Sequence, residues 1–137
     1  LMQQLTERGI TVIVNLAPIL PFINDDMENI QGLLSYCVKA GVYGILTDKM
    51  CPVLREGNRE RFYQQLYKNF PDIYDQYEAV YADEKTLKTK NYTEIMACIR
   101  ETCEAHGIQY DKEELLRFTR EYKNKTIGTQ LSLFDMM

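Results

Sequence analysis

A stiff, polar segment near the amino terminus holds residues suited to a binding site. The segment APILPFINDD, residues 17–26, combines Pro18 and Pro21 with Asn24 and Asp25. Proline fixes its own φ angle, so the loop is rigid, and the amide and carboxylate that follow offer polar contacts. This spacing predicts a ligand-binding loop.

A second segment, TDKMCPVLREGN at residues 47–58, mixes both signs of charge. It carries Asp48, Lys49, Arg55 and Asn58. A guanidinium group presents a planar fork of donors that matches a carboxylate or a phosphate. The segment therefore favours an anionic or carboxylate-bearing ligand.

Structural roles are the alternative for several of these residues. Asp25 and Asn58 both precede helix-like patterns, where such side chains cap the first turn. Arg55 and Arg59 would then be solvated surface residues. The sequence alone leaves both interpretations open.

Metal and thiol chemistry has little support. The cysteines form no CxxC pair, and we expect them to be reduced and buried; they are Cys37, Cys51, Cys98 and Cys103. The spacing from Cys98 to Cys103 is loose for a metal site. His106 is the only histidine and precedes Gly107 at a predicted helix end, where a cation complements the helix dipole.

The elements that position the two segments form a predicted strand, helix and strand. Residues 10–18, ITVIVNLAP, are β-branched and end at a proline, and residues 42–47, VYGILT, form a second apolar run. Between them, Asp25 and Glu28 resemble a capping box, and Gly41 is suited to end the helix. Such a unit places its strands parallel, with both segments following carboxyl ends.

Helical patterns fill most of the remaining chain. We expect helices to begin near Asn58, after Pro71, near Asn91 with Glu94, and at Asp111 with Glu114, the last running to Tyr122. The stretch 83–90, DEKTLKTK, reads as a charged loop, and 108–110, IQY, is a candidate third strand. Parallel sheets normally have several strands, so further ones would come from a second copy or from residues before Leu1.

Composition narrows the class of protein. The chain has 137 residues with 45% hydrophobic content, which suits one folded domain. Its net charge of −4 lacks the overall positive charge that is typical of nucleic-acid-binding domains. No apolar run approaches the roughly 18 residues of a membrane span. We expect a cytoplasmic protein that does not interact with membranes.

The motifs PILPFIND and LREGNRERFY, with the terminal QLSLFD, resemble the carboxyl-terminal half of radical S-adenosylmethionine proteins of the DNA repair photolyase or spore photoproduct lyase-like group. The resemblance implies an α/β fold: the carboxyl-terminal βαβ part of a partial (β/α) barrel over residues 1–57, then a helical region over 58–127 and a tail over 128–137. It also implies that a CxxxCxxC motif in the other half holds a 4Fe-4S cluster, which binds S-adenosylmethionine. This sequence lacks that motif, so we expect no cofactor and no lyase activity in this chain alone.

Several site residues follow from the same resemblance. The matching positions are Pro18, Pro21, Asn24 and Asp25 in the first loop, and Arg55, Glu56, Gly57 and Asn58 in the second. The first loop would help to wall the cosubstrate pocket. Cys51 stands where a small residue is expected, which favours packing. The missing amino-terminal half of the barrel is the implied partner, and the resemblance leaves open whether DNA is the substrate.

The end of the chain carries a short docking motif. QLSLF, from Gln130 to Phe134, resembles the pentapeptide with which bacterial replication and repair proteins bind the sliding clamp. Leu131, Leu133 and Phe134 would enter an apolar groove while Gln130 forms hydrogen bonds. The chain would then be a helical interaction module that recruits a repair protein. Alternatively, Leu133 and Phe134 fold back onto the chain's own helices.

Overall fold

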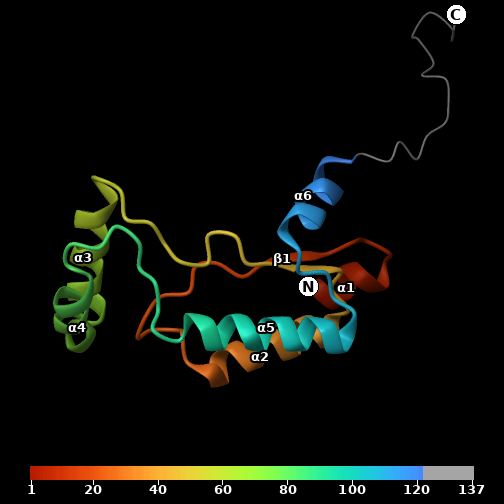
Figure 1. The fold of residues 1–137 in the computed structure, drawn as a ribbon, viewed down its shortest axis with the longest axis horizontal. Coiled ribbons are helices and arrows are strands. Elements are labelled where there is room, and N and C mark those ends of the chain that lie inside the picture. Colours follow the sequence, from red (N-terminus) through yellow and green to blue (C-terminus); the bar gives the residue numbers. More distant parts are fainter. Residues whose placement is uncertain (122–137) are drawn as a thin grey trace, which may run out of the picture.

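The computed structural model describes residues 1–121, which form a helix-rich fold around a small parallel sheet (Figure 1). In chain order the elements are α1 (Met2–Glu7), β1 (Ile13–Asn15), α2 (Met27–Ala40), β2 (Gly44–Leu46), α3 (Asn58–Asn69), α4 (Pro71–Tyr81), α5 (Tyr92–His106) and α6 (Lys112–Arg120). This helix-rich arrangement with one two-stranded parallel sheet agrees only in part with the expected α/β class, and residues 1–121 do not show a partial barrel.

The predicted βαβ unit is present, with shorter strands than expected. β1 and β2 are parallel, and Ile13 pairs with Gly44 while Asn15 pairs with Leu46. The amide of Leu16 donates the last hydrogen bond of the ladder, to the carbonyl of Leu46 at 2.8 Å. Pro18 follows and has no amide hydrogen to continue the ladder. β1 therefore ends where its backbone pairing with β2 ends.

The candidate third strand contributes a single bridge. Gln109 pairs in parallel with Gly44 on the other edge of β2, and the amide of Ile45 donates to the carbonyl of Gln109 at 2.9 Å. The side-chain oxygen of Gln109 then accepts hydrogen bonds from the amides of Tyr110 and Asp111. These bonds turn the backbone away from β2, so the pairing ends after one residue.

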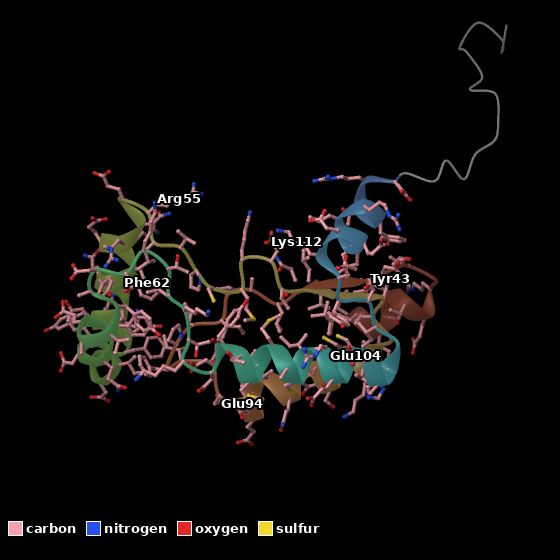
Figure 2. The ribbon with its side chains drawn as sticks, in the orientation of Figure 1. Tyr43, Arg55, Phe62, Glu94, Glu104 and Lys112 are labelled. Atoms are coloured by element: carbon pink, nitrogen blue, oxygen red, sulfur yellow. The ribbon has the colours of Figure 1, made fainter. Side chains whose placement is uncertain are left out.

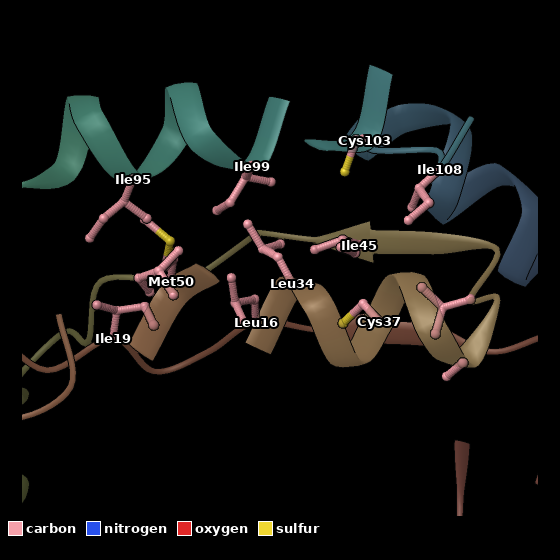
Figure 3. Close-up of a cluster of buried hydrophobic side chains, with 13 residues drawn as sticks. Leu16, Ile19, Leu34, Cys37, Ile45, Met50, Ile95, Ile99, Cys103 and Ile108 are labelled. Atoms are coloured by element: carbon pink, nitrogen blue, oxygen red, sulfur yellow. The ribbon is translucent and has the colours of Figure 1, made fainter. Parts of the chain in front are cut away.

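Helices cover both faces of the sheet. Successive strand residues point to opposite faces, and Ile45 joins the main core with residues of α2 and α5, which pack against each other (Figures 1 and 3). On the opposite side, Leu115 of α6 lies against the backbone of Gly44, where a side chain would collide with it.

A second apolar cluster forms around the α3–α4 pair. Its buried members are Leu54, Leu66, Tyr77, Tyr81 and Leu87. Phe22 and Ile23, from the loop after β1, pack against it, so this loop contacts both clusters. Stretch 83–90 is more than the charged loop that we expected, because Leu87 is fully buried and Thr89 is 2% exposed.

Helix ends follow the sequence signals at some positions and differ at others. Gly41 and Gly107 end α2 and α5 in the left-handed conformation, and Asp111 caps α6, as predicted. The cap of α2 is Asp26 rather than Asp25, because the Asp25 carboxylate is bonded elsewhere. Asn58 begins α3 without a side-chain cap, after Gly57 with φ 81°. The sequence did not predict α1.

Candidate functional site at the carboxyl ends of the strands

The loops that follow β1 and β2 lie side by side at the carboxyl ends of the sheet. The amide of Ile19 in the first loop donates to the carbonyl of Met50 in the second at 2.8 Å. Each loop also holds one non-glycine residue in the left-handed region, Phe22 with φ 62° and Lys49 with φ 60°. Backbone strain of this kind gathers at functional sites. The two predicted segments therefore meet at one edge of the sheet.

The side chain of Asn24 holds the first loop in shape. Its Oδ1 accepts from the amide of Leu20 at 2.6 Å, and its Nδ2 donates to the carbonyl of Pro18 at 3.3 Å. Pro21 is buried, and its carbonyl accepts a hydrogen bond from the hydroxyl of Tyr77 at 2.7 Å. Asn24 thus forms its side-chain hydrogen bonds within the loop, and the hydrogen bond between Pro21 and Tyr77 attaches the loop to α4.

Asp25 links the first loop to a distant part of the chain. One carboxylate oxygen accepts from the amide of Phe22 at 2.9 Å, and the other accepts from the hydroxyl of Thr89. The backbone carbonyl of Asp25 accepts from Asn91 Nδ2 at 3.2 Å. The carboxylate is therefore already partnered on both oxygens and positions the loop.

Arg55 and Asn58 lie away from the strand ends. Figure 2 shows Arg55 over the α3–α4 pair, and the carbonyl of Arg55 accepts from the amides of Asn58 and Arg59 at 3.0 Å each. Arg59 is not a free surface side chain, because it donates to the carbonyls of Ala82, at 2.6 Å, and Glu84. The structure thus brings Pro18 to Asp25 together in one loop and places Arg55 and Asn58 elsewhere.

Two polar residues near the strand ends, Asn15 and Lys112, were not singled out from the sequence, whereas their neighbour Asp48 was. Lys112 Nζ lies 2.9 Å from Asp48 Oδ1, and Asn15 is exposed at the end of β1. The hydrogen bond from Lys112 lowers the pKa of Asp48, and the same contact raises the pKa of Lys112. A lysine in the first turn of a helix opposes the helix dipole. That unfavourable placement was the available signal that Lys112 has an acidic partner.

The thiols do not form a metal site in residues 1–121. No group of three or more His, Cys, Asp or Glu in this range could hold a metal ion. Cys37 and Cys103 are buried in the main core, as expected, whereas Cys51 and Cys98 are only partly buried. Burial raises the pKa of Cys103 to about 11. A protonated thiol is a poor metal ligand. His106 stands at the carboxyl end of α5, as predicted, and is exposed.

Comparison of the chain with protein-family models, curated proteins and solved structures finds no match. Among the described helices, none is long and apolar enough to cross a membrane. The docking motif from Gln130 to Phe134 lies outside the described residues.

Proposed function

We propose that this chain is the carboxyl-terminal part of a radical S-adenosylmethionine lyase of the DNA repair photolyase-like group. In this proposal it supplies one corner of the pocket for cosubstrate and substrate. The observation that supports it is the pairing of the two loops, joined from Ile19 to Met50 beyond the ends of adjacent parallel strands. Ligands of parallel α/β folds bind at that edge of the sheet.

The residues of this chain would position the pocket wall. Asn24 and Asp25 are occupied by internal hydrogen bonds, so they hold the loop in shape. The groups with exposed surface at the strand ends are Asn15 and Lys49, together with the partly exposed Asp48, whose Oδ1 is paired with Lys112. An ammonium and a carboxylate side by side suit the charged amino-acid end of a small ligand. Bound to the cluster of the other half, S-adenosylmethionine would supply a carbon radical that abstracts hydrogen.

The experiment uses the full-length product of the gene that encodes this chain. We expect a CxxxCxxC motif in it, and 5'-deoxyadenosine formation after anaerobic reconstitution with iron and sulfide and addition of reductant. The same treatment of residues 1–137 alone should give no product. A full-length protein without such a motif, or a reconstituted one that forms no 5'-deoxyadenosine, contradicts the proposal.

A second candidate function rests on the QLSLF motif and its polar lead-in, KNKTIGT. A polar lead-in followed by apolar anchors suits a docking peptide that binds a bacterial sliding clamp. We expect binding in the micromolar range, about 7 to 9 kcal/mol. In fluorescence anisotropy, a labelled tail should bind the clamp and its Leu133→Ala, Phe134→Ala form should not. Failure of the native tail to bind, or unfolding of the protein on truncation after Thr129, contradicts this candidate.

A further inference from the structure

We propose that a groove between α5 and the edge of β2 binds a small planar aromatic molecule that carries one acidic group. The groove has a volume of about 400 Å³ and is lined by Thr47, Tyr92, Met96, Ile99, Arg100 and Tyr110, among others. This volume lies within the range of small-molecule sites, roughly 300 to 1,000 Å³. The inference goes beyond the proposed function, because Thr47 is the one residue of the two loops of the candidate site that lines the groove.

The floor and walls of the groove suit an aromatic body. Ile99 is 1% exposed, and Met96 packs against the same core, so the floor is apolar and fixed. Tyr92 comes from the first turn of α5 and Tyr110 from the segment between α5 and α6. Aromatic side chains from two elements offer ring contacts to a flat ligand.

Among the described residues that line the groove, Arg100 is the one that carries a charge, so the lining favours an anion. Arg100 is exposed and forms no salt bridge with any residue of the described range. The nearby carboxylate of Glu104 accepts a hydrogen bond from the Tyr110 hydroxyl at 2.8 Å. Lys88 does not line the groove, but its Nζ lies 4.3 Å from the centre of the Tyr92 ring and adds a second cation near one wall. Arg100 is therefore free to form a bidentate pair with a carboxylate or a phosphate.

The experiment follows backbone amide signals of the whole 137-residue chain by NMR while ligands are added. The probes are indole-3-carboxylate and adenosine monophosphate, which test whether the groove binds a carboxylate or a phosphate. Their uncharged counterparts, indole-3-carboxamide and adenosine, report the contribution of the acid group. We expect at least one acid to bind, with the largest shifts at Tyr92 to Arg100 and at Tyr110.

Variants locate the site and test its charge. Arg100→Gln should weaken binding of the acid about tenfold and leave its uncharged counterpart unchanged. Arg61→Gln, an exposed residue of α3 with the same change in charge, is the matched control. Ala97→Leu narrows the groove and should weaken charged and uncharged forms alike. The proposal is overturned if neither acid binds at millimolar concentration, if the shifts map elsewhere, or if Arg100→Gln and Arg61→Gln behave alike.

Discussion

Thr89 donates its hydroxyl hydrogen bond to the carboxylate of Asp25, joining residues 64 positions apart. Thr89 is 2% exposed, and its own oxygen accepts from the amide of Asn91 at 3.1 Å. The bond connects the loop after β1 to the segment before α5. Because that loop also contacts both apolar clusters, this contact helps to fix where the candidate site sits relative to α3 and α4.

Removing the Asp25 carboxylate should destabilise the fold. Asp25→Ala leaves the Thr89 hydroxyl and the Phe22 amide without their acceptor. Leaving a buried donor unsatisfied costs about 1 to 3 kcal/mol. Urea denaturation followed by circular dichroism measures the loss in unfolding free energy.

Two further variants separate the bond from its surroundings. Asp83→Ala changes an exposed aspartate of the 83–90 stretch and should leave stability within about 0.5 kcal/mol of the original. Thr89→Val combined with Asp25→Ala should cost less than the sum of the single changes. Strictly additive losses would show that the two side chains do not interact.

A methyl group at Gly44 should disturb the contact between β2 and α6. A Cβ there would collide with the side chain of Leu115 and would lie 3.0 Å from the carbonyl oxygen of Gln109. Overpacking of this kind costs roughly 1 to 3 kcal/mol. We expect Gly44→Ala to lower the urea midpoint and to broaden or shift the amide signals of Lys112 to Arg120.

The control for this substitution is Gly32→Ala. Gly32 is exposed within α2, and a Cβ there meets nothing within 4 Å. Alanine is preferred over glycine in a helix by up to about 1 kcal/mol, so this variant should be more stable. Combining Leu115→Ala with Gly44→Ala should cost less than the sum of the two single losses, because the smaller side chain relieves the collision. If Gly44→Ala is neutral, α6 does not pack on β2 as described.

Local signals in the sequence predicted much of the fold. Gly41, Gly107 and Asp111 end or begin their helices because capping depends on neighbouring residues. The apolar runs around Val14 and Ile45 predicted the parallel pair for a similar reason. Each of these features depends on a few adjacent positions.

Long-range contacts set the features that the sequence did not predict. Asp25 has the capping residue type, yet Thr89 and Phe22 occupy its carboxylate, and Asp26 takes the cap. The position of α6 depends on the packing of its Leu115 against the backbone of Gly44, which is distant in the sequence. No local pattern encodes which distant side chain reaches a given oxygen or backbone surface.

Burial of Cys103 should make part of the stability depend on alkaline pH. Its pKa is raised from the ordinary value of 9.0 to about 11 by burial, so the folded state keeps the thiol protonated after the unfolded chain loses its proton. This contribution is fully present below about pH 9 and is lost as pH rises toward 11. The stability difference between the original protein and Cys103→Ala should therefore shrink over that range in urea titrations. A constant difference would contradict the predicted shift.

The pair of Asp48 and Lys112 should give an opposite, acidic dependence. The Lys112 hydrogen bond lowers the pKa of Asp48 below its ordinary value of 3.8, so the pair favours the folded state above that value. The contribution is lost as pH falls through the folded pKa, and both side chains are partly exposed, so the effect on stability is small. NMR titration of the Asp48 carboxyl carbon should show a midpoint below 3.8 that rises in Lys112→Gln. Lys85→Gln, at an exposed position outside α6, is the control and should leave the midpoint unchanged. Equal midpoints in the Lys112→Gln variant and the original protein would mean that α6 does not hold Lys112 against the end of β2.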